Sequence, residues 1–150
     1  MSASRSARSG FNKALITIGG VLAGAVVGAM ANMGVIAGSA ALVPPPVGVD
    51  MNNPESINAH IGYFSTAQLL CPFFAHAIGT LLGAYLAAVI ARRGGRELFA
   101  AAIVGVLFLL GGIMAVSMIP NAPLWFDVLD LGFAYMPMAV LGLRLARKNR

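Results

Sequence analysis

The feature that most constrains this chain is a series of four long apolar runs, at residues 14–42, 63–91, 98–119 and 124–145. A helix needs about 20 mostly apolar residues to cross a hydrocarbon core of roughly 30 Å, and each run reaches that length. The composition agrees, because only 10% of the residues are charged, against about 25% in an average soluble domain. The sequence therefore predicts an all-α, four-transmembrane-helix bundle that forms one membrane domain over residues 1–150.

The basic residues cluster before the first run, between the second and third runs, and after the fourth. They are Arg5, Arg8, Lys13, Arg92, Arg93, Arg96, Arg144, Arg147, Lys148 and Arg150. Loops rich in Lys and Arg stay on the cytoplasmic side of a membrane, and alternate loops of a four-span chain share a side. We therefore predict that both termini are cytoplasmic and that the loop at residues 43–62 lies outside.

The net charge of +5 admits more than one kind of partner. Three juxtamembrane clusters would contact the anionic lipid headgroups of the bilayer. The clusters are separated along the chain and have no aromatic platform between them, so we expect no nucleic-acid binding. We interpret the first run as an uncleaved anchor, because signal sequences have apolar runs of only about 7–15 residues.

The connections carry turn and cap signals. Residues 93–97 predict a tight cytoplasmic hairpin, and residues 120–123 predict a tight outer hairpin with Asn121 as a helix N-cap. In the longer outer loop, three prolines at residues 44–46 stiffen the chain. The Asn-Pro-Glu sequence at residues 53–55 then predicts the start of a short surface helix.

Small residues recur at helical spacing within the apolar runs. Lipid provides no hydrophobic drive for helix association, so small residues that let backbones approach favour packing. The candidate packing residues are Gly20, Gly24, Gly28, Gly79, Gly83 and Gly105. Gly34 and Gly38 continue the first stripe more loosely, and Gly111 with Ala115 marks the third run. We favour packing within one bundle, and the alternative is an interface with a second copy or another membrane protein.

Six polar residues fall in the outer half of the predicted bundle, on a rise of about 1.5 Å per residue. They are His76, Asp127, Asp130, Gln68, Asn32 and Tyr135. Ionisable groups inside a membrane are costly and indicate function, so these residues predict a polar pocket that opens to the outer face.

Two interpretations of this pocket remain open. In one, Asp127 and Asp130 share a proton or hold a cation, with Gln68 or His76 as a neighbour. In the other, which we favour, the carboxylates sit near a helix N-terminus in the interface. His76 is then a structural partner of Asn32 or Thr80 through hydrogen bonds. Pro72 and Pro137 lie within the predicted second and fourth helices, where each predicts a kink.

No pattern in the chain indicates catalysis. Asp50, Glu55 and His60 lack a recognised ligand spacing, so we predict no metal site. Cys71 lies among apolar neighbours and is interpreted as a packing residue. No nucleophile motif or phosphate-binding loop is present, so we expect neither an enzyme nor a cofactor.

Several short segments occur together in this sequence. They are residues 44–48 (Pro-Pro-Pro-Val-Gly), 75–81 (Ala-His-Ala-Ile-Gly-Thr-Leu), 83–84, 111–114 (Gly-Gly-Ile-Met), 118–120, 123–126, 129–131, 135–139 and 141–142. With these segments the chain resembles a family of small four-span bacterial inner-membrane proteins that has no assigned activity. The resemblance covers most of the chain beyond the basic tail and implies four spans in a bacterial envelope. The chain lacks the polar track of four-span fluoride channels and the first-span glutamate of small multidrug transporters.

Two functions remain. The leading prediction is a non-catalytic assembly or accessory protein that uses its glycine stripes to associate with itself or with a membrane-protein partner. The alternative is a small proton-linked transporter or ion-conducting protein that uses Asp127, Asp130 and His76.

Overall fold

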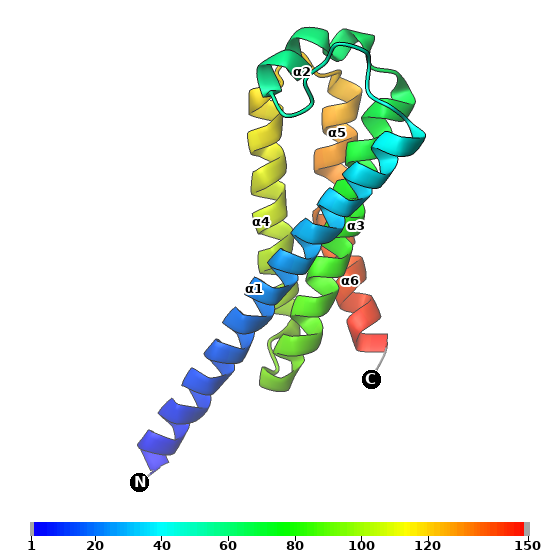
Figure 1. Cartoon of the computed structure of the whole chain (residues 1–150). Coiled ribbons are helices and arrows are strands. Elements are labelled where there is room, and N and C mark those ends of the chain that lie inside the picture. The colour runs from blue at the N-terminus through cyan, green and yellow to red at the C-terminus, as the bar shows by residue number, and fades with distance from the viewer. Residues whose placement is uncertain (1, 149–150) are drawn as a thin grey trace.

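The structure is a computed structural model that describes the backbone of residues 2–148 and the side chains of residues 10–148 (Figure 1). The chain is 84% helical, and no strand occurs within the described range, so the predicted all-α class is confirmed. The helices are α1 (Ser2–Leu42), α2 (Pro54–His60), α3 (Thr66–Ala91), α4 (Glu97–Met118), α5 (Leu124–Phe133) and α6 (Met136–Lys148). Two short 3-10 helices, η1 (Ile61–Tyr63) and η2 (Arg92–Gly94), follow α2 and α3. The side chains of Arg5 and Arg8, and all of Arg150, lie outside the described residues.

Four segments are long and apolar enough to cross a membrane. They are α1 from Gly10 onward, α3 with η2, α4, and α5 together with α6. The chain therefore has the four-span architecture of a multi-pass membrane protein. α1 begins at Ser2, earlier than the predicted residue 14, because the preceding stretch contains Ala and Arg and no proline. α3 continues through Pro72 without a break.

The predicted fourth helix, residues 124–145, is in fact two helices. α5 and α6 are separated by a turn at Ala134 and Tyr135. Pro137 explains the break, because it has no N–H to donate to the carbonyl of Phe133 and its ring crowds that carbonyl. The turn points Tyr135 into the bundle, where it is 1% exposed.

α1 and α3 pack against each other at the predicted glycine stripes. A Cβ added at Gly24 would collide with the carbonyl oxygen of Gly83. A Cβ added at Gly28 would lie 2.6 Å from the carbonyl oxygen of Gly79, and Gly20 lies in the same seam. The two backbones thus approach as closely as glycine permits. These stripes are used for packing within one chain, as the favoured interpretation expects.

Other glycines divide into packed and open positions. A Cβ at Gly105 would lie 2.7 Å from the Cβ of Ala139, so this predicted residue packs α4 against α6. Gly142, which the sequence did not indicate, packs α6 against the carbonyl of Leu81. The extension of the stripes is wrong, because an added Cβ would have no neighbour within 4 Å at Gly34, Gly38 and Gly111.

Small side chains fill the half of the bundle that carries the chain termini, termed here the terminal end. Its core consists of Ala84, Ala87, Ala88, Ala91, Ala100, Ala101, Val104, Ala139, Leu143 and Ala146. Nη1 of Arg92 donates to the carbonyl of Ala146 at 3.0 Å, and Arg147 pairs with Glu97 at 3.4 Å. α3, α4 and α6 are therefore held together at this end.

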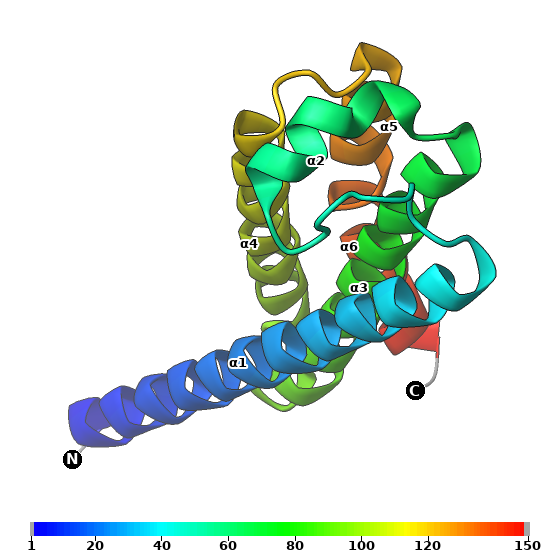
Figure 2. The ribbon, with the colours of Figure 1, turned by 45° about the horizontal axis from the view of Figure 1, so that its top comes forward.

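The opposite end, termed the α2 end, is covered by residues 43–65 (Figure 2). The predicted surface helix is confirmed as α2, with Pro54 in its first turn and the Asn53 side chain accepting a backbone N–H. The predicted cap at Asn121 is wrong. Pro123 holds the N-cap position of α5, and no side chain caps that helix. A proline at this position supplies the extended backbone from which the helix starts.

Candidate functional site

A cavity of about 430 Å³ lies at the α2 end. Its walls come from α1, α3, α4 and α5, and Ile57, Ile61 and Phe64 of the covering segment line it as well, so it is termed the roofed cavity. Most of its lining is apolar. The polar lining residues are Ser39, Asn52, Gln68, His76, Asp127 and Asp130. Four of the six predicted pocket residues therefore meet in one cavity.

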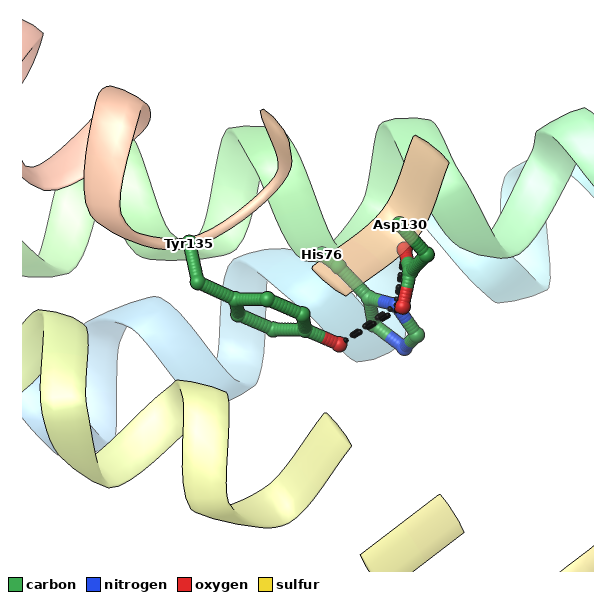
Figure 3. A network of polar contacts seen from close by, with 3 residues as sticks. All are labelled: His76, Asp130 and Tyr135. Atoms are coloured by element: carbon green, nitrogen blue, oxygen red, sulfur yellow. Dashed lines mark hydrogen bonds and ion pairs between the residues drawn. The ribbon is translucent and has the colours of Figure 1, made fainter. Parts of the chain in front are cut away.

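His76 and Asp130 form a hydrogen-bonded cluster with Tyr135 (Figure 3). Nδ1 of His76 lies 2.8 Å from Oδ1 and 3.0 Å from Oδ2 of Asp130. The hydroxyl of Tyr135 donates to Oδ2 of Asp130 at 2.9 Å and lies 3.0 Å from Nδ1 of His76. The three side chains, termed the His-Asp-Tyr cluster, come from α3, α5 and the turn before α6.

An ionised Asp130 would determine which atoms of the cluster carry protons. An ionised carboxylate only accepts hydrogen bonds, so Nδ1–H of His76 and the hydroxyl of Tyr135 are the donors to Asp130. With Nδ1 protonated, the other ring nitrogen, Nε2, carries the lone pair of a neutral imidazole. Nε2 has no hydrogen-bond partner among the described residues. Figure 3 shows dashed lines at one ring nitrogen of His76 and none at the other.

The cluster is buried unequally. The side chain of Asp130 is 4% exposed, whereas that of His76 is 22% exposed. The His76 and Tyr135 rings stack with centroids 5.6 Å apart. Asp130 is thus an anchored acceptor, and His76 is the more exposed of the two residues at the cavity.

Gly112 of α4 makes room for the cluster. A Cβ added at Gly112 would collide with the hydroxyl of Tyr135 and lie 2.6 Å from its Cζ. Sequence reasoning missed this residue, because its neighbour Gly111 gave the better spacing to the predicted stripe. The sequence did contain a signal, because Pro137 predicts a break in the fourth run and Gly112 is a glycine on the run that faces it.

A second pocket of about 440 Å³ lies between α1 and α4 and shares His76 and Gly112 with the roofed cavity. Asn32 and Tyr135, the two remaining predicted pocket residues, line it. Oδ1 of Asn32 is buried and has no hydrogen-bond partner, and the same is true of Oγ1 of Thr80. The structural interpretation that pairs His76 with Asn32 or Thr80 is therefore wrong, because the imidazole is already engaged by Asp130.

Asp127 stands apart from the cluster. It lies one turn before Asp130 and lines the roofed cavity, and its buried Oδ1 has no hydrogen-bond partner. The hypothesis that Asp127 and Asp130 share a proton does not describe this arrangement, since Asp130 is engaged by His76 and Tyr135. The structure thus contains one satisfied and one unsatisfied carboxylate.

Gln68 lines the cavity but is not a hydrogen-bonding neighbour of the carboxylates. Its Oε1 accepts the backbone N–H of Ser65 at 2.8 Å and completes the N-terminal cap of α3. Its Nε2 donates to the carbonyl of Pro44 at 2.6 Å. Oδ1 of Asn58 accepts the backbone N–H of Asn121 at 2.9 Å. These two contacts tie the roof to α3 and to the loop before α5.

Within residues 10–148, no group of three or more His, Cys, Asp or Glu side chains could hold a metal ion. The loop candidates serve local structure instead. Oδ1 of Asp50 accepts the backbone N–H of Asn52 at 2.9 Å, and Nδ1 of His60 lies 2.7 Å from the carbonyl of Ser56. The thiol of Cys71 donates to the carbonyl of the preceding helical turn.

The chain matches no protein-family model, no curated protein and no solved structure. Its functional evidence is therefore the local chemistry at the α2 end. A basic imidazole nitrogen, an anchored carboxylate and apolar walls suit proton exchange together with the binding of a small apolar molecule.

Proposed function

We propose that this protein is a small proton-linked transporter in which His76 takes up and releases the proton. The observation that carries the proposal is the pairing of Nδ1 of His76 with buried Asp130, which leaves Nε2 free at a cavity. Histidine is the side chain best suited to exchange protons at physiological pH, and the partner of one ring nitrogen sets the role of the other.

Asp130 would offset the cost of a positive charge on His76 in apolar surroundings. An isolated imidazolium is costly away from water, because the surroundings do not solvate its charge. When Nε2 binds a proton, the positive charge spreads over a ring whose Nδ1 lies 2.8 Å from Oδ1 of Asp130, so the pair is neutral as a whole. Tyr135 holds the carboxylate in place in both states.

The location follows from the distribution of charge. The basic clusters flank the spans at the terminal end, and the positive-inside rule places such clusters in the cytoplasm. Together with the family resemblance, this supports a bacterial inner membrane with both termini cytoplasmic and the basic clusters against anionic headgroups. The roofed cavity then lies in the outer half of the bundle.

The test is proton flux into proteoliposomes. A potassium gradient with valinomycin imposes a negative internal potential, and an internal dye reports acidification. We expect uptake with the wild-type protein, and loss of that uptake in Asp130→Asn and His76→Gln. Glu55→Gln, which removes a carboxylate outside the cluster, should keep the wild-type rate. Wild-type uptake equal to that of empty liposomes, or an unchanged rate in Asp130→Asn, would contradict the proposal.

A second candidate is the assembly role, and one observation favours it. The N-terminal part of α1 extends beyond the other helices (Figure 1) and exposes Phe11, Leu15 and Ile18. Gly19 is open on the same segment. A second copy or another membrane protein would cover these residues. Native mass spectrometry of the extracted protein should then show a complex that Phe11→Ser weakens, and a monomer alone would contradict this role.

A further inference from the structure

We propose that the roofed cavity binds a lipophilic organic cation, an amine with an apolar body and an ammonium head, and that Asp127 accepts a hydrogen bond from that head. This inference deepens the proposed function by naming the class of solute. It rests on that function only for the exchange of a proton with His76.

The size and walls of the cavity fit a compact apolar body. Its volume of about 430 Å³ falls within the range of roughly 300–1,000 Å³ that is typical of small-molecule sites. Met33 and Ile36 of α1, Val116 of α4, Ile119 directly after α4, and Phe126 of α5 line it. Such walls favour an apolar molecule that leaves water or lipid and offers its few polar atoms at one end.

Asp127 provides the contact for the polar end. Its Oδ1 is buried without a donor, and a buried acceptor without a partner is unfavourable. Asp130 differs, because His76 and Tyr135 already donate to it. Nε2 of His76 is a second acceptor without a partner. The cavity therefore offers acceptors that lack donors, and an ammonium group supplies several N–H donors.

The charge around the cavity selects a cation. No Lys or Arg lines it. The carboxylates that line it are those of Asp127 and Asp130. A cleft lined by one sign of charge raises the local concentration of the opposite ion. An anion would be repelled.

An inorganic cation fits less well than an organic one. Hard cations such as Ca²⁺ take six to eight oxygen ligands at close range. The lining offers mostly carbon, and the described side chains contain no cluster able to hold a metal. An ammonium group needs only a few acceptors, and its apolar body uses the walls that a bare ion would leave empty.

The experiment measures binding of 1-naphthylmethylamine to the protein in lipid nanodiscs by isothermal titration calorimetry. The neutral probe 1-naphthylmethanol has the same body without the charge, and empty nanodiscs give the background. We expect the amine to bind wild type at least about tenfold more tightly than the alcohol. Asp127→Asn should weaken amine binding by about tenfold or more, because a hydrogen bond to a charged group is lost. The alcohol should bind the variant and the wild type alike.

Two further variants make the result specific. Glu55→Gln removes a carboxylate from the same end but outside the cavity lining, so it should leave amine binding unchanged. Ala115→Phe fills the cavity without changing its charge and should abolish binding, which keeps the test valid if Asp127→Asn misfolds. Equal affinity for the amine and the alcohol, or equal amine affinity in Asp127→Asn and wild type, would overturn the inference.

Failure of this inference is distinguishable from failure of the proposed function. Amine binding that depends on Asp127, in a protein that conducts no protons, would leave the inference standing and remove the transporter. Proton flux that depends on Asp130, in a protein that binds no amine, would do the reverse.

Discussion

The two ends of this bundle are built from different residues. At the terminal end, alanine and glycine bring helices into backbone contact. At the α2 end, Met, Ile, Val and Phe side chains, together with several polar side chains, surround a cavity of about 430 Å³. One half of the molecule is thus closely packed, and the other half contains a cavity lined by polar and apolar side chains.

The boundary between the two ends falls within single helices. On α1, Gly28 is the last glycine in the close seam, and Asn32 still touches Gly79 of α3. Met33 then begins the part of α1 that lines the cavity, and Gly34 has no close neighbour. On α4, Gly111 is open while Gly112 contacts Tyr135. Glycines next to each other on one helix therefore differ in whether another residue packs against them. Substitutions at both positions can test this difference.

The largest effect is expected in the seam. Gly24→Ala places a methyl group against the carbonyl of Gly83, which forces α1 and α3 apart and should destabilise the fold by roughly 1–3 kcal/mol. Gly19→Ala on the same helix meets no atom within 4 Å. It should stabilise α1 by about 1 kcal/mol or less, since alanine favours helix more than glycine does. Thermal unfolding in one detergent measures both, and a similar loss in the two variants would contradict the division.

A smaller effect is expected at the boundary. Gly112→Ala pushes the hydroxyl of Tyr135 away from Asp130 and should cost about 1 kcal/mol, the net worth of one hydrogen bond. It should also reduce proton flux as Tyr135→Phe does, because both variants take a donor from Asp130. Gly111→Ala, one residue earlier, should cause no measurable loss of stability or of proton flux. Equal flux in Gly112→Ala and Gly111→Ala would show that the cluster tolerates displacement of Tyr135.

Much of the terminal end was predictable from the sequence. Apolar run length gave the four spans, and the period of Gly24, Gly28, Gly79 and Gly83 gave the seam, because both depend on local spacing alone. Spacing did not reveal which glycines are covered. Gly34 and Gly111 fit the pattern but face open space, since coverage depends on where the neighbouring helix ends or diverges.

The sequence indicates which residues gather at the site but not which of them form hydrogen bonds with one another. Depth arithmetic placed His76 and Asp130 in one half of the bundle, yet the i,i+3 spacing paired Asp130 with Asp127, one turn away on the same helix, and named His76 only as one of two candidate neighbours. Pro137 accounts for the third member of the cluster, because it breaks the helix and turns Tyr135 inward to Asp130. The Ser-x-x-Gln pattern at Ser65 signals a helix cap, and this would have removed Gln68 from the predicted hydrogen-bonding neighbours of the carboxylates.

The smallest effect is expected in the roof, where one side chain has two tasks that are separable. Gln68→Ala removes both the cap contact with Ser65 and the contact with the carbonyl of Pro44. Ser65→Ala removes the cap hydroxyl but leaves the amide of Gln68 able to reach Pro44. Both should lower stability by about 0.5–1 kcal/mol, so unfolding alone does not distinguish them.

Amide hydrogen exchange separates the two tasks. In Gln68→Ala the backbone amides of residues 47–52 should exchange several-fold faster than in wild type, because the roof has lost its tie to α3. In Ser65→Ala they should keep the wild-type rate. Faster exchange in both variants would mean that the cap itself holds the roof. Unchanged exchange in both would mean that the tie between Asn58 and Asn121 suffices, so that the roof closes the cavity from the α5 side alone.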